Sequence, residues 1–480
     1  MTFTVIRIVF VILAIIGTTY LLPLTVALSL GEKSVIVAFL IPMLASWLIA
    51  AILISLGRKK KVTLSTRAGY VTVALAWLAS SLFGSLPLYI SGAIPSFANA
   101  FFESVSGFTT TGATILSDIE SLPRSINLWR CQTHWLGGMG IVVLTVALLP
   151  ILGVGGFQLI KAETTGPEKG KLTPKITTTA KVLWFIYFGM TVIHAILLKL
   201  AGMDVIDSIS HAFSTLSTGG FSSRNNSIGY YNSAVIDWIC WIFMFLAAIN
   251  FSLYYYLFTK KITEIKNNSE LKFYIGVTFC AALLIGFFER SSYGGFFKAL
   301  RYSFFQTSTI ISSTGYATAD YTNWSPASQA IILALMFMGG CSGSTAGGVK
   351  MIRWLILAKQ FHNEILKILH PHGVFTIRLD KRAGRKDIVF TVTAFFFVYA
   401  LLIFISTLFA TIFKLDLFTA FTGAVSMAGN IGPAFNLLGP SCNYGFLPSA
   451  VKYFYSFVML AGRLEFFTMA ILLSPSFWKR

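Results

Sequence analysis

The residues in this sequence that are best placed to do chemistry lie in four related segments, each built around one glycine. A hydroxyl-bearing residue stands six positions before each glycine, and an oxygen-bearing residue stands two positions before it. The segments read FFESVSGFTTTGAT, ISHAFSTLSTGGFS, FFQTSTIISSTGYA and FTGAVSMAGNIGPA, and they align without gaps on Gly112, Gly220, Gly315 and Gly432. A fourfold internal repeat of this kind indicates four copies of one structural unit.

The chemistry that fits these segments is the coordination of a cation by backbone oxygen atoms. Glycine permits turns that are closed to other residues, so that successive carbonyl groups face one point. Four converging loops offer rings of carbonyl oxygen atoms in place of a cation's water shell, and the C-terminal end of a short helix before each loop adds partial negative charge. Small-residue runs also serve simple helix packing, but four gap-free copies favour the cation site over that alternative.

The elements that position these segments must lie in a membrane. Of the 480 residues, 55% are hydrophobic and 11% are charged, whereas a soluble domain is about 25% charged. The apolar residues form runs of roughly 20, the length that crosses the hydrocarbon core of a bilayer. The formal charge of +19 is better explained by the membrane surface than by nucleic acid, so we expect a lipid bilayer and no nucleic acid as partners.

The positive charges predict the topology. Five polar segments, together with Arg7, hold 26 of the 37 Lys and Arg residues but 7 of the 18 Asp and Glu residues. The segments are residues 57–67, 157–181, 259–272, 350–387 and 479–480. Such clustering indicates the cytoplasmic side, and hydropathy places two helices between consecutive segments. We therefore expect an all-α polytopic membrane protein with ten transmembrane helices and both termini in the cytoplasm.

The spacing of the glycines predicts the organisation of these helices. The intervals of 108, 95 and 117 residues suit one helix, a re-entrant pore helix with its loop, and a second helix. Non-helical backbone at membrane depth survives only where protein buries it or where it lines a water-filled cavity, so the four loops should share a cavity. The expected units are an N-terminal transmembrane helix pair in residues 1–57 and four repeats in residues 68–156, 180–258, 271–358 and 387–480.

A glycine-rich stretch after the third repeat segment is a candidate gate. The apolar residues 326–338 are followed by GGCSGSTAGGV, which has five glycines in eleven residues before Lys350. Each glycine costs about 1 kcal/mol in a helix interior, so the helix should break at membrane depth below the four loops. A kink that only serves helix packing is the alternative. A phosphate-binding P-loop is excluded because Val349 stands where that motif requires glycine and no strand precedes it.

Two ionisable residues in the last apolar segment are the other candidates for a functional role. Arg463 and Glu465 are costly inside a membrane helix, and residues two apart on a helix do not face each other, so each needs a separate partner. We expect Arg463 to point into the pore and to bond the glycine-rich stretch; an Arg that only holds helices together is the alternative. The candidate gate residues are Gly339, Gly340, Gly343, Thr345, Gly347, Gly348, Lys350 and Arg463.

The four segments resemble those of the Trk/Ktr/HKT superfamily of potassium transporters. TTTGAT, STGGFS, SSTGYA and GNIGPA stand at the four filter positions of that superfamily. The runs QTHWLGGMGI, GGCSGSTAGGVKMIR and GRLEFFTMAILLSPSFW are similar to the TrkH-type branch in particular. The resemblance implies a K+ filter formed by Thr110, Thr111, Gly112, Thr218, Gly219, Gly220, Ser313, Thr314, Gly315, Asn430, Ile431 and Gly432.

The resemblance also implies an activity and an assembly. It implies K+ uptake through one pore that an intramembrane loop closes, a homodimer in the inner membrane, and a cytoplasmic nucleotide-binding ring of the TrkA type as partner. K+ would be the bound and transported ion, with no cofactor in the chain itself. The fourth segment departs from an all-glycine pattern because Asn430 and Ile431 precede Gly432.

Other functions remain as alternatives at this stage. A Na+-permeable or Na+-coupled transporter would share this architecture. An alternating-access carrier with broken helices is disfavoured because such carriers have inverted repeats, whereas these four segments run in one orientation. An enzyme is not expected, since neither H-E-x-x-H nor G-x-S-x-G occurs. The charges of residues 350–387 fit either a lipid-facing surface or a regulatory partner.

Overall fold

The computed structural model describes residues 2–57, 65–140, 176–380, 382–383 and 387–479. Within these residues the elements are helices, apart from one antiparallel pair of two-residue strands, β1 (Arg378–Leu379) and β2 (Arg382–Ala383). The end of the predicted first repeat, residues 141–156, and most of the cationic segment 157–181 lie outside the described residues. The expectation of a mostly helical protein is confirmed.

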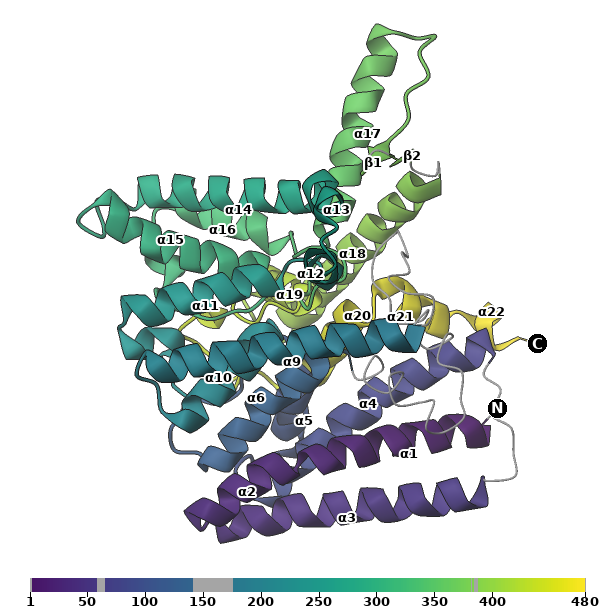
Figure 1. The fold of residues 1–480 in the computed structure, drawn as a ribbon, viewed down its shortest axis with the longest axis vertical. Coiled ribbons are helices and arrows are strands. Elements are labelled where there is room, and N and C mark those ends of the chain that lie inside the picture. The colour runs from purple at the N-terminus through teal and green to yellow at the C-terminus, as the bar shows by residue number, and fades with distance from the viewer. Residues whose placement is uncertain (1, 58–64, 141–175, 381, 384–386, 480) are drawn as a thin grey trace.

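The N-terminal helices form a layer beside the first long helix of the repeats. Helices α1 (Thr2–Thr19) and α3 (Lys33–Leu56) lie side by side along one side of the molecule, next to α4 (Thr66–Ile90), and α2 (Leu21–Leu30) continues α1 (Figure 1). The hydroxyl of Tyr20 donates to the carbonyl of Phe83 at 2.9 Å. The Tyr20 ring lies edge-on to Trp129 at 4.6 Å. This contact joins the N-terminal helices to the rest of the core.

One succession of elements occurs four times along the chain: a long helix, a short helix that ends in a glycine turn, and a further helix. The four sets are α4, α5 (Phe97–Phe108) and α6 (Arg124–Gly138); α9 (Ile176–Leu200), α10 (Val205–Leu216) and α11 (Ala234–Ala247); α14 (Ser269–Phe288), α15 (Phe296–Ile311) and α16 (Pro326–Met336); and α18 (Asp387–Ile412), α19 (Leu417–Gly429) and α20 (Ser449–Arg463). The remaining helices within the described residues are α12 (Phe251–Phe258), α13 (Ile262–Asn267), α17 (Met351–Leu369), α21 (Phe466–Leu473), α22 (Pro475–Trp478) and the 3₁₀ turns η2 (Ser227–Tyr231), η3 (Tyr321–Asn323) and η4 (Asn436–Leu438).

These four sets pack into a closed ring. The last helix of each set contacts the short helix of the next set, through the pairs α6 with α10, α11 with α15, and α16 with α19. Helix α20 of the fourth set then contacts α5 of the first. The short helices therefore lie between neighbouring sets, where most of their residues are buried.

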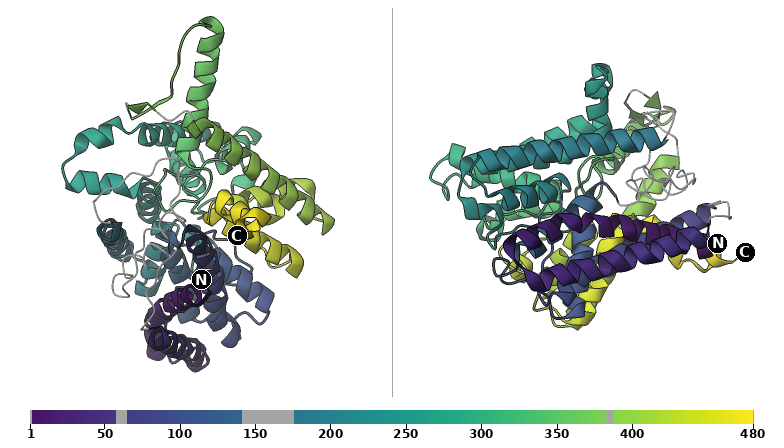
Figure 2. Two further views of the ribbon diagram at one scale, coloured as in Figure 1. Left: turned by 90° about the vertical axis from the view of Figure 1, so that its right-hand side faces the viewer. Right: turned by 60° about the horizontal axis from the view of Figure 1, so that its bottom comes forward.

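The outer surface of the described helices is apolar. Phe185 on α9, Phe297 on α15 and Phe390 on α18 each expose at least three quarters of their surface. Monomeric soluble proteins rarely expose large apolar patches, and a bilayer explains this one. Helix α17 projects away from the other helices and carries β1 and β2 at its base (Figures 1 and 2).

The described residues contain six helices that are long and apolar enough to cross a membrane. Two helix pairs add one span each if the pair is counted as a single broken helix: α11 with α12, bent by 92°, and α20 with α21, bent by 115°. Two further expected crossings are α16, which has 11 residues, and α6, which leads toward residues outside the described part. The count of ten stays a prediction.

Candidate ion path

Each of the four short helices ends in the same hydrogen-bonded turn. The residue two before the glycine has a positive φ of 51–56°, and its N–H bonds the carbonyl three residues earlier. The next N–H bonds the carbonyl five residues earlier, over the pairs Thr111–Ser106 (2.9 Å), Gly219–Ser214 (2.8 Å), Thr314–Thr309 (2.8 Å) and Ile431–Ser426 (3.0 Å). This is the Schellman arrangement, which satisfies the free carbonyl groups at a helix end. We call these four structures the glycine turns.

The glycine turns touch one another in a closed ring. All four glycines have φ between 78° and 97°, which disfavours any other residue. A Cβ atom added at each glycine would collide with a backbone carbonyl of the following turn. The collisions are Gly112 with Gly219, Gly220 with Thr314, Gly315 with Ile431, and Gly432 with Thr111. The fourth contact returns to the first turn, so the ring has no gap.

The ring opens to one cavity. All four glycines line a hollow of about 160 Å³, together with the segments that follow the turns. Backbone carbonyl groups of four turns therefore meet beside a shared space. That arrangement suits the coordination of a desolvated cation, because carbonyl oxygen atoms replace water oxygen atoms.

The fourth turn differs from the other three in its polar contacts. The carbonyl of Gly432 accepts hydrogen bonds from Ser426 Oγ at 2.9 Å and from the hydroxyl of Tyr444 at 2.6 Å. The amide of Asn430 donates to Thr111 Oγ1 at 3.0 Å and to the carbonyl of Met459 at 2.9 Å. The side chain of Asn430 thus ties the fourth turn to the first.

A side chain nine residues before the glycine braces three of the four turns. Glu103 on α5 accepts from Thr114 Oγ1 at 2.8 Å and from the N–H of Ile115 at 2.9 Å. Arg130 on α6 forms a buried ion pair with Glu103 at 2.7 Å. The corresponding contacts in the second and third sets are His211 Nε2 with Ser222 Oγ (2.9 Å) and Gln306 Nε2 with the carbonyl of Ala319 (2.9 Å).

Glu103 and Gln306 were missed by the sequence reasoning, although a signal was present. The third letter of each aligned segment is Glu, His, Gln or Gly, so three of the four positions carry a hydrogen-bonding side chain. A polar residue repeated at one position of a buried helix indicates a buried partner, since unpaired polar groups are costly to bury.

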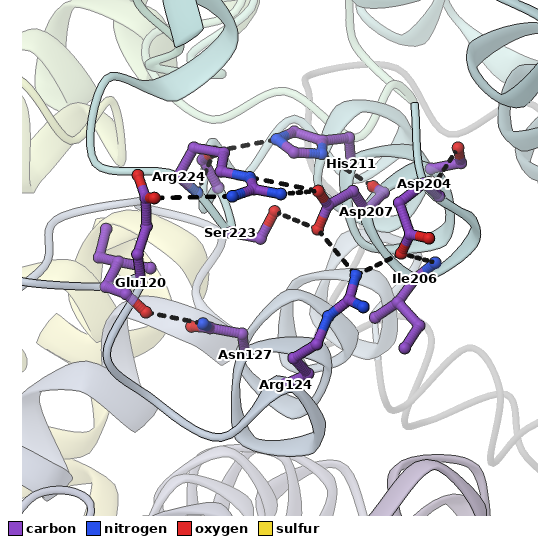
Figure 3. A network of polar contacts seen from close by, with 12 residues as sticks. Glu120, Arg124, Asn127, Asp204, Ile206, Asp207, His211, Ser223 and Arg224 are labelled. Atoms are coloured by element: carbon purple, nitrogen blue, oxygen red, sulfur yellow. Dashed lines mark hydrogen bonds and ion pairs between the residues drawn. The ribbon is translucent and has the colours of Figure 1, made fainter. Parts of the chain in front are cut away.

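An ion-pair network joins the segments that follow the first and second turns (Figure 3). Arg224 pairs with Asp207 at 2.7 Å and with Glu120 at 3.5 Å. Arg124 pairs with Asp204 and approaches Asp207 at 3.8 Å. Partial burial raises the pKa of Asp204, but the hydrogen bond and charge of Arg124 outweigh it, so the pKa lies below its ordinary value. Asp204 therefore stays ionised at neutral pH.

The glycine-rich loop, residues 339–350, lies directly against the turns. It begins after α16 and ends at α17, so the helix breaks where the glycines predict. The N–H of Gly347 donates to Ser313 Oγ at 2.6 Å, and a Cβ atom added at Gly347 would lie 2.6 Å from the carbonyl of Gly429. Thr345 Oγ1 donates to the carbonyls of Leu216 at 3.0 Å and Ala247 at 3.1 Å. The loop is thus bonded to the second and third sets and packed against the fourth.

Backbone hydrogen bonds join the beginning and the end of the loop to each other. The N–H of Gly339 donates to the carbonyl of Val349 at 2.9 Å, and the N–H of Met351 donates to the carbonyl of Gly340 at 3.1 Å. The body of the loop is held from outside, because the N–H of Phe251 donates to the carbonyl of Gly343 at 3.0 Å. Lys350 is buried, and its ammonium group bonds the carbonyl of Ala346 within the loop.

Arg463 bonds the loop, as the sequence predicts. Its Nη1 donates to the carbonyl of Thr345 at 2.9 Å, and its Nη2 donates to the carbonyls of Gly137 at 2.7 Å and Gly138 at 2.8 Å. The partners in α6 were not anticipated; they belong to the last turn of that helix, where carbonyl groups have no intrahelical partner. Arg463 therefore connects the loop to the first set.

Glu465 has a partner separate from that of Arg463, as expected. The expectation that both residues lie within one helix is wrong. Glu465 does not lie within one continuous helix with Arg463: α20 ends at Arg463, and Glu465 has a φ of 66° in the bend before α21. The carboxylate pairs with Arg353 on α17, whose guanidinium lies 3.7 Å from the ring centre of Phe395.

Comparisons of the sequence and of the structure with known proteins both find similarity to TrkH proteins. The family model described as TrkH, a cation transport protein, matches residues 35–286 and 297–480. The Trk system potassium uptake protein TrkH of Halomonas elongata is 41% identical over 430 residues, which cover 88% of each chain. TrkH of Escherichia coli K12 is 38% identical over 427 residues, with the same coverage. The crystal structure of the potassium transporter TrkH from Vibrio parahaemolyticus matches all of both chains with a TM-score of 0.88 and 34% identity.

Proposed function

The chain belongs to the TrkH family of cation transport proteins and is a potassium uptake transporter, and we propose that K+ crosses it through the ring of glycine turns. The filter consists of residues 110–112, 218–220, 313–315 and 430–432. Residues 339–350 and Arg463 form the gate.

The closed ring of four turns is the observation that carries this proposal. Each glycine faces the carbonyl of the next turn, and the four glycines line one cavity. Backbone carbonyl groups that converge from four turns replace part of the hydration shell of K+. The four short helices also direct their partially negative C-terminal ends toward the ring, which favours a cation over an anion.

The gate is supported by the contacts of the loop. Its Gly347 bonds Ser313, a residue of the third turn, so the loop occupies the space next to the filter. Arg463 holds the loop through Thr345 and places a guanidinium on the same side of the ring. A cation leaving the filter meets both a backbone plug and a positive charge until the loop moves.

The fourth turn supports one alternative, a pore that also passes Na+ or couples to it. The Gly432 carbonyl is engaged by Ser426 and Tyr444, and Asn430 and Ile431 precede that glycine. The four turns therefore differ in the hydrogen bonding of their carbonyl groups and in their sequence. An alternating-access carrier is less well supported, because the four sets follow one another in a single orientation around the ring.

The positions of the termini support a cytoplasmic location for both. The N- and C-terminal ends lie at the same side of the molecule (Figure 1), where Arg67 Nη1 donates to the carbonyl of Lys479 at 2.9 Å and Arg7 Nη1 donates to the carbonyl of Gly57 at 3.0 Å. With the positive-inside distribution, this side faces the cytoplasm of an inner membrane. A homodimer and a TrkA-type ring docked on residues 350–387 complete the proposed assembly.

A flux experiment tests the proposal directly. Purified protein in liposomes should conduct K+ in preference to Na+, and a TrkA-type ring with nucleotide should change the K+ flux. Equal K+ and Na+ flux would favour the Na+-permeable alternative. Flux no greater than that of empty liposomes, with and without the ring, would contradict the proposed pore.

A further inference from the structure

One carboxylate outside the proposed filter and gate residues bonds both the glycine-rich loop and the helix that follows it. Glu270 Oε1 accepts a hydrogen bond from the N–H of Ser342 at 2.7 Å and from the N–H of Ile352 at 3.0 Å. The two donors are ten residues apart in sequence, one in the loop and one in the first turn of α17. The side chain of Glu270 is 5% exposed, so water does not compete for this oxygen atom.

Glu270 belongs to a helix that does not need it as a cap. It lies in the first turn of α14, and the side chain of Asn268 already caps that helix by accepting from the N–H of Leu271 at 2.7 Å. The Glu270 carboxylate instead accepts hydrogen bonds from two other elements, the glycine-rich loop and α17.

The N-terminus of helix α17 has no side-chain cap from its own N-cap residue. Its N-cap residue, Lys350, makes no side-chain capping bond. The first N–H groups of a helix have no intrahelical partner, and a negative charge near them is favourable. Glu270 supplies a hydrogen-bond acceptor to the N–H of Ile352, so it caps α17 from a neighbouring helix.

We propose that Glu270 is a positioning residue that holds the loop in its closed place beneath the filter; this inference rests on the proposed gate. It acts through the loop and does not touch K+. By fixing Ser342 and Ile352 to one oxygen atom, it prevents the loop from withdrawing from Ser313 and Arg463. Loss of the carboxylate releases the start of α17 and the loop together.

The latch lies one residue from a surface element. Asp380, in the turn between β1 and β2, accepts from the N–H of Ser269 at 2.7 Å. Asp380 is exposed, and Leu379 beside it packs in a cluster with Ile356 of α17. Asp380 therefore contacts the helix that carries Glu270, and Leu379 contacts the helix that Glu270 caps.

Cys341 provides a probe of loop position that does not depend on transport. It is buried next to Ser342, whereas Cys280 and Cys442 are exposed. In a background with Cys280→Ser and Cys442→Ser, the remaining cysteines are Cys131, Cys240 and Cys341, all buried. The rate at which a water-soluble methanethiosulfonate modifies Cys341, assigned by peptide mass spectrometry, reports whether the loop has moved.

The test compares Glu270→Ala and the nearly isosteric Glu270→Gln in this background, as full-length protein in liposomes. We expect modification of Cys341 and basal K+ flux each to rise about tenfold or more in Glu270→Ala, because both hydrogen bonds that Glu270 accepts are lost. Glu270→Gln keeps one acceptor oxygen atom, so both values should rise less in this variant. The matched control is Glu264→Gln, an exposed carboxylate on α13, which should leave both values unchanged.

The outcomes separate the latch from the gate. Unchanged Cys341 modification and flux in folded Glu270→Gln and Glu270→Ala would overturn the latch, while a rise in flux on deletion of the loop would leave the gate standing. Faster modification without increased flux in Glu270→Ala would show that the loop moves but does not gate, which overturns the proposed gate. An unchanged ratio of K+ to Na+ flux in the open variants supports a latch that acts on the loop and leaves the filter intact.

Discussion

The backbone N–H of Gly347 donates a 2.6 Å hydrogen bond to the side-chain oxygen of Ser313. The first residue belongs to the glycine-rich loop and the second to the third glycine turn, so the proposed gate and the proposed filter are in direct contact. Ser313 carries a positive φ of 55° because it occupies the left-handed position of a Schellman turn. The same geometry that shapes the turn thus presents the hydroxyl group to the loop.

The first prediction concerns the glycines of the ring. Gly220→Asp and Gly315→Asp should each abolish selective K+ flux while the protein still inserts, because a Cβ atom at these positions meets the carbonyls of Thr314 and Ile431. The measurement is K+ and Na+ flux in liposomes. Gly189→Ala in α9 is the control, since a Cβ atom there meets nothing within 4 Å. Wild-type selectivity in both Asp variants would exclude the ring as the filter.

The second prediction concerns the loop as a plug. Deletion of residues 343–347 removes the hydrogen bond to Ser313 and the contact with Arg463. Basal K+ flux should rise, because nothing then fills the space next to the third and fourth turns. The flux is normalised to monodisperse protein. A folded deletion variant with equal or lower flux would mean that the loop is not a gate.

The third prediction separates the two roles of Arg463. Arg463→Ala removes the donors to Thr345, Gly137 and Gly138 together with a positive charge, and basal K+ flux should rise. Arg463→Lys keeps the charge but loses the planar fork of donors. Flux near wild type in the Lys variant indicates electrostatic repulsion, and flux near the Ala variant indicates a hydrogen-bonded latch.

A structural role for Arg463 leads to a different result. Lower expression, or a dissociated dimer, with unchanged flux per folded protein would assign Arg463 to helix packing alone. If both variants match wild type in flux and in expression, Arg463 has no part in gating.

The fourth prediction concerns the buried pair of Glu103 and Arg130, whose side chains are at most 1% exposed. Removing one partner leaves an unpaired buried charge, which costs about 3–5 kcal/mol. Glu103→Ala should therefore lower the free energy of unfolding by this amount and reduce the ratio of K+ to Na+ flux, since Thr114 and Ile115 lose their anchor.

The control for this pair is an ion pair on the surface. Glu364 and Lys367 on α17 are about half exposed, and exposed pairs contribute roughly 0–1 kcal/mol. Glu364→Gln should leave thermal unfolding and selectivity close to wild type. Equal effects of the two substitutions would show that Glu103 does not brace the first turn.

Much of the proposed site could be predicted from sequence because its signals are local. A glycine with an oxygen-bearing residue two positions before it marks each turn, and five glycines in eleven residues mark the loop. The position of Arg463 near the end of an apolar segment predicts a polar partner, which the structure provides in Thr345. Each of these inferences needs only residues that are close in the chain.

The amino-acid sequence by itself determined the membrane setting, the four glycine turns and the break after α16, because hydropathy, spacing and glycine content act within one segment. Only the tertiary structure decided that the turns close into a ring in the order of the chain, that Arg463 reaches Gly137 and Gly138, and that Glu270 caps α17 from a neighbouring helix. These contacts join residues tens to hundreds of positions apart. Their partners are backbone N–H and carbonyl groups, which nearly every residue carries, so only the packing of the helices selects which of them meet.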